Sequence, residues 1–340
     1  MRHCRRPVIA GSAVAALLFA GIPAVADPSI TITQLPLLPG TQSSSANAVN
    51  AHGTIVGSSG PAAVEWTTSG AITDLGTLPG GDLSEANGIN DTGTVVGDTF
   101  LTGGYQAVKW SPGGAITALP PLRAGDITVA TAVNDNGTIV GWEKFAGTGG
   151  IHVVRWNPDG TSDDLGQGTF NHGHPAAINA KGTIAGWSTA VDQNGSRGMR
   201  WKPNGKATVL PQLPGAVQDT GAAQGINDQG VMVGVSATTV RREHEAVVWS
   251  KQGAITALAQ LPGGTDSQAV GINDNGVIAG DGYDANGVFQ GIRWAADGTM
   301  TLLPTPAGGT YPIPAAINDN GAIVGTVSLA SGLTVAVRWR

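Results

Sequence analysis

The sequence VNDNGTIVG, residues 133–141, is one of seven copies of a nine-residue motif that decides the fold of this chain. Each copy reads apolar, Asn, any two residues, Gly, any residue, two apolar residues and Gly. The copies are Val49–Gly57, Ile89–Gly97, Val133–Gly141, Ile178–Gly186, Ile226–Gly234, Ile272–Gly280 and Ile317–Gly325. Successive motif Asn residues lie 40 to 48 residues apart. A period of this length predicts one supersecondary unit that is copied along the chain.

A second marker follows the motif with the same period. It is a Trp that closes a short apolar run, at Trp66, Trp110, Trp156, Trp201, Trp249, Trp294 and Trp339. A large aromatic residue at one place in each unit is what packing between repeated sheets requires. Two markers in phase predict a single repeat domain over residues 27–340.

The second unit illustrates the strands that we predict. Residues 71–78, 85–90, 94–96 and 106–110 favour strands, and Gly, Pro, Asn and Asp between them favour turns. The motif Asn is expected to bond turn backbone through its side chain. The Lys or Arg that precedes most of the repeated Trp residues is expected to be a cross-strand partner near the outer edge of the sheet.

An all-β, seven-bladed β-propeller with four-stranded antiparallel blades fits this unit. A β-helix coil takes about half as many residues, whereas a propeller blade takes roughly 40 to 50 residues and four strands. The strand predicted at residues 29–38 matches the first strand of a unit, and residues 335–340 match the last. We therefore predict that the N-terminal strand pairs in the C-terminal blade and closes the ring.

The two ends of the blades differ in the predicted loops. Tight turns such as residues 135–137 and 158–160 fall together on one face. The loops that follow each second motif Gly, and the connections that mostly read Leu-Pro-Gly-Gly, fall on the opposite face, here called the variable face. Variable loops on a rigid scaffold are where binding residues concentrate.

The N-terminus has the features of a cleaved export signal, predicted over residues 1–26. Three arginines precede an apolar stretch at residues 7–22 and an Ala-Val-Ala site at 24–26. A membrane anchor is the alternative, but a span needs about 20 apolar residues. Cleavage would remove Cys4, the one cysteine. We therefore predict a secreted, periplasmic or cell-surface protein without disulfides.

The charge of the chain excludes some partners. The formal charge is −6, and loss of the three signal arginines moves it to −9. Such a chain lacks the basic surface expected of proteins that bind nucleic acids or anionic membranes. We expect no nucleic-acid partner and no membrane insertion after cleavage. We expect the partner to be a polysaccharide or an exported protein.

The recurring order of DLGTLPGG (residues 74–81), AxxIN, GxVVG and a Trp-closed strand resembles the HAF repeat family of bacterial exported proteins. The resemblance covers residues 30–340. The His-Ala-Phe tripeptide of that family is absent, and the corresponding positions read, for example, Ala107-Val108-Lys109-Trp110. The resemblance implies secretion and a repeat scaffold, and it implies no catalytic motif.

A ligand-binding patch is predicted in the third and fourth units. Trp142 and Trp187 directly follow a second motif Gly, outside the repeated Trp series, and suit stacking on sugar rings. An additional buried Trp is the alternative at each. The proposed polar partners are His172, His174, Glu143 and Asp192. The two histidines lack an identifiable third metal ligand, and a solvated loop is the alternative for them.

No catalytic residue, metal or cofactor is predicted. The Asn-Asp-x-Gly runs have the wrong spacing for a calcium loop, and hairpin turns explain them. The leading expectation is a non-catalytic binding or interaction scaffold that uses the variable face. The alternatives are a polymer-degrading hydrolase or lyase with residues gathered from several blades, and a purely structural repeat protein. A carboxylate and a His with perturbed pKa values that converge in a cleft would favour the enzyme.

Overall fold

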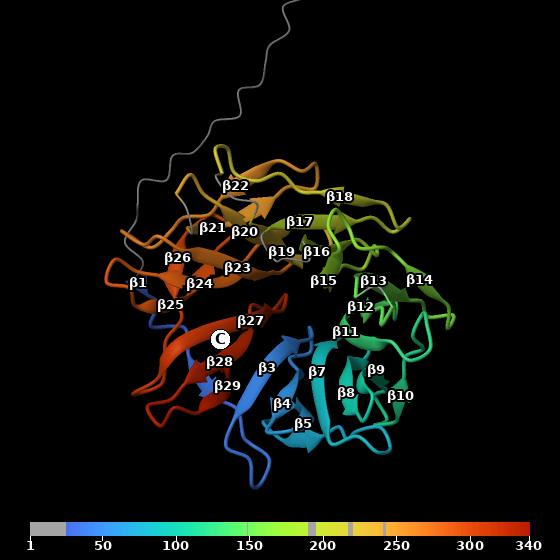
Figure 1. Cartoon of the computed structure of the whole chain (residues 1–340). Helices are drawn as coiled ribbons and strands as arrows, with labels where there is room; N and C mark the ends of the chain where they lie inside the picture. The colour runs from blue at the N-terminus through green and yellow to red at the C-terminus, as the bar shows by residue number, and fades with distance from the viewer. Residues whose placement is uncertain (1–24, 148, 190–194, 217–219, 241–242) are drawn as a thin grey trace, which may run out of the picture.

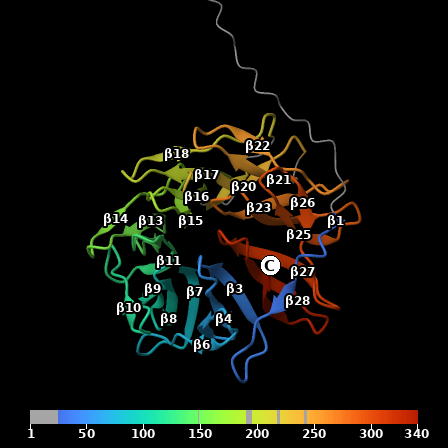
Figure 2. The ribbon, with the colours of Figure 1, turned by 180° about the vertical axis from the view of Figure 1, so that it is seen from behind.

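The computed structural model describes residues 25–147, 149–189, 195–216, 220–240 and 243–340. Within these ranges the chain is all-β, with 29 strands and no helix, and so no helix that could cross a membrane. The sheets are arranged around a common central axis, as Figures 1 and 2 show from opposite sides.

Each copy of the motif lies in an antiparallel group of four strands. The first three groups contain β3 (Ser44–Val49), β4 (Ile55–Ser59), β5 (Ala62–Trp66) and β6 (Ile72–Asp74); β7 (Leu83–Ile89), β8 (Val95–Leu101), β9 (Gly104–Trp110) and β10 (Ile116–Ala118); and β11 (Ile127–Val133), β12 (Ile139–Lys144), β13 (Ile151–Trp156) and β14 (Ser162–Asp164). The next three contain β15 (His172–Ile178), β16 (Ile184–Thr189), β17 (Ser196–Trp201) and β18 (Ala207–Val209); β19 (Gly221–Ile226), β20 (Met232–Ala237), β21 (His244–Trp249) and β22 (Ile255–Ala257); and β23 (Ser267–Ile272), β24 (Ile278–Tyr283), β25 (Phe289–Trp294) and β26 (Met300–Leu302). A single parallel bridge between Ile151 and His172 joins the third and fourth groups into one eight-stranded sheet, so the hydrogen-bonded sheets number six.

The last group brings together the two ends of the described chain. It contains β27 (Thr310–Ile317), β28 (Ile323–Ser328) and β29 (Thr334–Trp339), and its outer strand is β2 (Ile32–Gln34). Ile32 pairs with Trp339, and the partners run antiparallel. At the predicted signal cleavage site, β1 (Val25–Ala26) pairs in parallel with β26; residues 1–24 lie outside the described residues.

The outer strand of each group corrects one sequence prediction. Residues 71–78 were expected to begin the second unit, but their strand, β6, pairs with β5 of the first group. A tight turn at residues 67–70 joins β5 to β6, where the amide of Gly70 donates to the carbonyl of Thr67. The longer connection that follows β6 separates it from β7. Each group therefore begins with the strand that leads into the motif, and the first six groups end with the short strand after the Trp.

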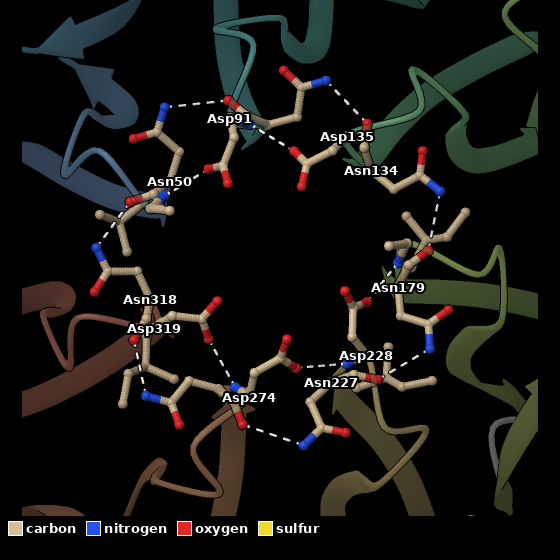
Figure 3. A pocket seen from close by; sticks show the side chains of 18 of the residues that line it. Asn50, Asp91, Asn134, Asp135, Asn179, Asn227, Asp228, Asp274, Asn318 and Asp319 are labelled. Atoms are coloured by element: carbon tan, nitrogen blue, oxygen red, sulfur yellow. Dashed lines mark hydrogen bonds between the residues drawn. The ribbon is translucent and has the colours of Figure 1, made fainter.

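The motif Asn joins neighbouring groups. Its Oδ1 accepts from the backbone amide four residues later, as Asn134 does from Thr138 at 2.9 Å. Its Nδ2 donates to the carbonyl of the next motif Asn, as Asn134 does to Asn179 at 3.0 Å. Seven such bonds follow one another, and the last runs from Asn318 to Asn50 at 2.8 Å. Figure 3 shows this ring of side chains around the axis.

The two glycines of the motif have different physical roles. The first, such as Gly137 with φ 78°, occupies the left-handed conformation of the hairpin turn. The second faces a β-bulge on the preceding strand, and a Cβ on Gly141 would lie 2.0 Å from the carbonyl oxygen of Val129. The same bulge occurs in all seven groups. A side chain at the second position therefore cannot fit without shifting backbone.

The repeated Trp residues fill the space between groups, as predicted. All seven are at most 3% exposed. In five of them the indole Nε1 donates to a carbonyl in the connection that precedes the group, as Trp294 does to Ala259 at 2.8 Å. Each Trp thus contributes apolar burial, and these five also fix a connection that lies beside the variable loops.

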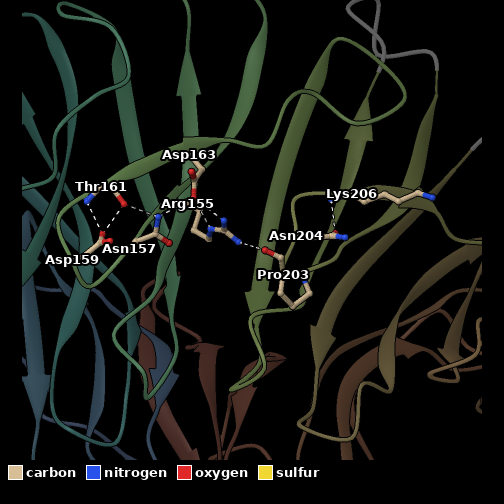
Figure 4. Close-up of polar contacts among 8 residues, drawn as sticks. All are labelled: Arg155, Asn157, Asp159, Thr161, Asp163, Pro203, Asn204 and Lys206. Carbon is tan, nitrogen blue, oxygen red and sulfur yellow. Dashed lines mark hydrogen bonds and ion pairs between the residues drawn. The ribbon is translucent and has the colours of Figure 1, made fainter.

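The basic residue before the Trp is a cross-strand partner in the third group, as predicted. Arg155 lies opposite Asp163, and its Nε and Nη2 donate to Asp163 Oδ2 at 3.0 and 2.7 Å. Its Nη1 also donates to the carbonyl of Pro203 in the next group at 2.6 Å (Figure 4). Arg200 reaches the turn of the fifth group in the same way, through the carbonyls of Ser250 and Lys251. The outer edge therefore has its own contacts between groups.

We expect Asn134→Ala to lower the free energy of unfolding by about 1–3 kcal/mol. It leaves the half-buried amide of Thr138 without its acceptor, and it removes one of the two bonds to the Asn179 carbonyl, which still accepts from the amide of Gly182. Asn134→Asp should cost at least as much at neutral pH, since it keeps the acceptor but replaces the donor with a buried charge. Chemical denaturation measures both. The matched control is Asn136→Ala, which removes an exposed bond to the carbonyl of Ala180 and should cost no more than about 1 kcal/mol. Equal losses at positions 134 and 136 would contradict a special role for the ring.

Candidate functional site

Three residues of the predicted patch come together in the fourth group. His174 and Trp187 are cross-strand partners on β15 and β16, and their rings stack with centroids 5.3 Å apart and 19° between the planes. The His172 ring meets the His174 ring edge-on at 6.3 Å. Burial, with a smaller contribution from His172, lowers the pKa of His174 to about 4. His174 is therefore neutral at physiological pH, and the pair forms a half-buried aromatic surface.

The other predicted residues are placed differently. Trp142 lies half-buried on β12 of the third group. Glu143 is fully buried, and its carboxylate accepts from the backbone amides of Leu122 and Arg123 at 2.7 and 3.0 Å. It therefore holds the connection between β10 and β11 and is not presented to a ligand at the surface. Asp192 lies outside the described residues.

A larger candidate site lies between the fifth and sixth groups. This cavity, here called the β20–β24 cavity, has a volume of about 360 Å³. Its lining residues are Thr220, Val235, His244, Asp266, Ser267, Gln268, Asp281, Gly282, Tyr283 and Phe289. They come from β20, β21, β23, β24 and β25 and from the residues directly before β19 and β23, where the strands meet the variable loops. The cavity therefore opens on the variable face.

The floor of the cavity carries carboxyl and amide groups. Asp281 is 3% exposed, and its Oδ2 accepts from Gln268 Nε2 at 3.1 Å. Burial, helped by the nearby Asp266, raises the pKa of Asp281 to about 7, although the bond from Gln268 opposes this. A substantial fraction of the Asp281 side chains is therefore protonated near neutral pH and can donate a hydrogen bond as well as accept one.

Asp266 and His244 form a second polar pair at the side of the cavity. His244 Nδ1 lies 3.7 Å from Asp266 Oδ1. Burial raises the pKa of Asp266, while the neighbouring His244 acts in the opposite direction. Two carboxyl groups in different environments and one imidazole thus line the same small space.

An aromatic rim, formed by Tyr283, Phe289 and Tyr311, extends from the cavity across the sixth and seventh groups. Tyr283 meets Phe289 edge-on at 5.2 Å, and Phe289 lies 5.6 Å from Tyr311. Tyr283 and Tyr311 are 39% and 51% exposed. Among the described residues, Tyr311 is the only non-glycine with positive φ, at 51°. Backbone strain of this kind concentrates at functional sites, and here it holds an exposed ring beside the cavity.

The β20–β24 cavity was not predicted from the sequence, although Asp281 occupies a position of the repeat that was singled out in two other groups. Asp281 follows a second motif Gly, the position that Trp142 and Trp187 occupy in their groups. Gln268 and His174 are likewise equivalent, five residues before the motif Asn. Only the two aromatic residues at this position were predicted to bind a ligand. Its burial, which gives it unusual chemistry, depends on the neighbouring group and has no local signature.

The axial cavity on the tight-turn face is the other polar site. Its volume is about 200 Å³, and the motif residues of all seven groups line it. Five carboxylates face it, from Asp91, Asp135, Asp228, Asp274 and Asp319, and each Oδ1 already accepts from a backbone amide of the preceding motif. In the described ranges no group of three or more His, Cys, Asp or Glu residues is arranged to hold a metal ion. These backbone contacts give the five carboxylates a structural role, because each of them joins its motif to the preceding one.

Comparison with known proteins is informative about the fold. A streptogramin B lyase structure matches with a TM-score of 0.60 and 16% identity over 92% of this chain and 97% of that chain. The virginiamycin B lyase from Staphylococcus aureus matches with a TM-score of 0.58 and 14% identity over 91% of this chain and 99% of that chain. A putative TolB from Agrobacterium tumefaciens matches with a TM-score of 0.52 and 12% identity over 88% of this chain and 99% of that chain. The chain has a β-propeller fold. No family model and no curated protein matches it.

The raised pKa of Asp281 predicts a pH-dependent stability. The folded protein binds the proton of the Asp281 carboxyl group more tightly than the unfolded chain does. The stability that this proton contributes is therefore complete below pH 4 and is lost as the pH rises to about 7. Asp281→Asn cannot ionise, so its free energy of unfolding should rise relative to wild type across that range. Urea denaturation between pH 4 and 8 measures the difference. The free energy of unfolding of the exposed Asp82→Asn variant should follow that of wild type across this pH range. If the Asp281→Asn curve also ran parallel to wild type, it would contradict the raised pKa of Asp281.

Proposed function

We propose that this chain is an exported seven-bladed β-propeller that binds a carbohydrate on its variable face. Seven motif groups, the pairing of β2 with β29, and the bond from Asn318 to Asn50 support a closed ring. The N-terminal signal pattern and the resemblance to the HAF repeat family support export. Polymers and proteins outside the cytoplasm are then the partners within reach.

The observation that carries the binding proposal is the β20–β24 cavity with its aromatic rim. Exposed aromatic faces stack on the apolar faces of sugar rings, and a few converging polar groups below them fix orientation. Asp281 and Gln268 supply carboxyl and amide groups for sugar hydroxyls, and Tyr283 and Tyr311 supply the stacking surface. Asp266, a second carboxyl group, adds negative charge when ionised and disfavours acidic sugars. The proposed ligand is an uncharged glycan.

We expect the mature protein, residues 27–340, to bind at least one of the hexasaccharides of cellulose, chitin, xylan and laminarin in isothermal titration calorimetry. In the Tyr283→Ala/Tyr311→Ala variant the β20–β24 cavity should bind that sugar at least about 10-fold more weakly, which corresponds to about 1.4 kcal/mol of lost stacking. Val209→Ala, at an exposed site on the outer strand β18, is the control. Thermal melting establishes that each variant is folded.

The same titration tests the patch predicted from sequence. If Trp142→Ala/Trp187→Ala abolishes binding and the Tyr variant does not, the glycan site is the His174–Trp187 surface. If folded wild type binds none of the four sugars, the carbohydrate proposal fails, and a protein partner or a structural role takes its place.

A hydrolase or lyase that acts on such a glycan is the second candidate. It is favoured by one observation, namely that Asp281, Asp266 and His244 line one cavity and that burial raises the pKa of both carboxyl groups. Asp281 in its protonated form is suited to general acid chemistry, and the Asp266–His244 pair is suited to accept a proton. Two of the compared structures are named lyases, which supports the second candidate by analogy of fold alone.

Product analysis separates the two candidates. If the chain is an enzyme, incubation with the bound polymer should release shorter or unsaturated products, and Asp281→Asn should reduce the rate at least about 100-fold while binding persists. Loss of rate and binding together would assign Asp281 to ligand contact. The absence of products from wild type at concentrations that saturate binding would overturn the enzymatic candidate.

A further inference from the structure

The second group repeats the unusual chemistry of the sixth group. Asp98 follows a second motif Gly, as Asp281 does. Of the seven groups, these two have a carboxyl group at this position, and the others have Ser58, Trp142, Trp187, Val235 and Thr326. Asp98 is also buried, at 7% exposed, and its Oδ1 accepts from Asn87 Nδ2 at 3.1 Å.

The aromatic pair beside this carboxyl group is repeated as well. Phe100 and Tyr105 are cross-strand partners on β8 and β9, in the register that Tyr283 and Phe289 have on β24 and β25. The Phe100 and Tyr105 rings meet edge-on at 5.2 Å, the same separation as in the sixth group. Tyr105 is 44% exposed. The exposed ring is therefore on the third strand here and on the second strand in the sixth group.

The contact beneath the carboxyl group also has a counterpart. Asn47 Nδ2 donates to Glu85 Oε1 at 3.1 Å across the first and second groups. Gln224 Nε2 donates to Gln268 Oε1 at 3.3 Å across the fifth and sixth groups. In both places the donor lies three residues before its motif Asn and the acceptor five residues before the next one. The two cavities are thus equivalent positions of the repeat with related polar floors.

An open space accompanies these residues. The cavity between the first and second groups, here called the β4–β8 cavity, has a volume of about 180 Å³. Its lining residues are Ser58, Gly60, Pro61, Leu83, Ser84, Glu85, Asp98 and Tyr105. Leu83, at 42% exposed, joins Tyr105 as an apolar rim above the carboxyl groups. This is the combination of stacking surface and converging polar groups that a sugar site uses.

We infer that the β4–β8 cavity is a second glycan site, so that one chain holds two points of the same polymer. This inference rests on the proposed function of the β20–β24 cavity. Both cavities open at the ends of the strands that lead into the variable loops, and the two groups lie across the axis from each other in Figure 1. Burial also raises the pKa of Asp98 to about 6, so the two carboxyl groups share their chemistry. A polymer that spans both sites gains avidity of about 10²–10⁴ over either site alone.

Calorimetry with the hexasaccharide that binds in the four-sugar panel tests the inference, because a short ligand occupies the cavities independently. Wild type should bind two hexasaccharides per chain. Asp98→Asn/Tyr105→Ala and Tyr283→Ala/Tyr311→Ala should each bind one, and the corresponding long polymer should bind either variant at least about 10-fold more weakly than wild type. Val209→Ala should match wild type in both measurements, and thermal melting checks that the variants are folded.

The other outcomes separate the inference from the proposed function. One hexasaccharide per chain, lost in the Tyr283 variant and unchanged in the Tyr105 variant, would overturn the second site and leave the first. One hexasaccharide, lost only in the Tyr105 variant, would overturn the two-site arrangement and the location proposed for the first. No binding of any of the four sugars by folded wild type would overturn both.

Discussion

The bond from each motif Asn to the carbonyl of the next motif Asn is the constraint on which the rest of the structure depends. One amide group closes its own hairpin through Oδ1 and reaches the neighbouring group through Nδ2. Asp offers no donor for the second bond, and Gln places its amide one carbon further from the backbone. Because these amides are 4–6% exposed, a lost partner would not be replaced freely by water. The same residue therefore recurs at seven positions.

This constraint acts at one end of the strands and leaves the other end free to vary. The tight turns, the Asn ring and the carboxylates around the axis are tied to backbone groups of neighbouring motifs. At the opposite end, the position after the second motif Gly holds a buried carboxyl group in two groups and an indole in two others. The propeller thus places different chemistry at equivalent positions of the repeat. The His174–Trp187 pair and the Gln268–Asp281 pair of the β20–β24 cavity occupy the same positions in their groups.

The fold was largely predictable because its determinants are local and repeated. The motif turn, the Trp marker and the period required no knowledge of distant contacts, and the turn bond of the motif Asn followed from the known behaviour of its side chain. The bond from Asn134 to Asn179 was not foreseen, since it depends on how neighbouring groups are placed. The second glycine was unexplained for the same reason, because only the structure shows that a side chain on Gly141 would strike the carbonyl oxygen of Val129, beside the bulge between Ala130 and Ala132.

The candidate site was harder to predict than the fold. Asp281 looks like an ordinary polar residue in the sequence, and its altered acidity comes from burial against the fifth group. Tyr311 precedes Pro312 with nothing to indicate the left-handed backbone that aims its ring at Phe289. Conversely, Glu143 looked available for a ligand, but two backbone amides bind it within the molecule. Contacts between repeats, which sequence patterns do not encode, decide these roles.

The pairing of β2 with β29 has a consequence for the order in which the molecule is assembled. Ile32 and Trp339 are separated by more than 300 residues, so β2 has no partner until β29 has been synthesised. The preceding groups can form from neighbouring segments as the chain grows, but this join must wait and must overcome the entropy of closing a very long loop. The pairing of β2 with β29 is therefore the step that completes folding. A chain that loses either strand is left with an unpaired strand edge, which is open to pairing with another molecule.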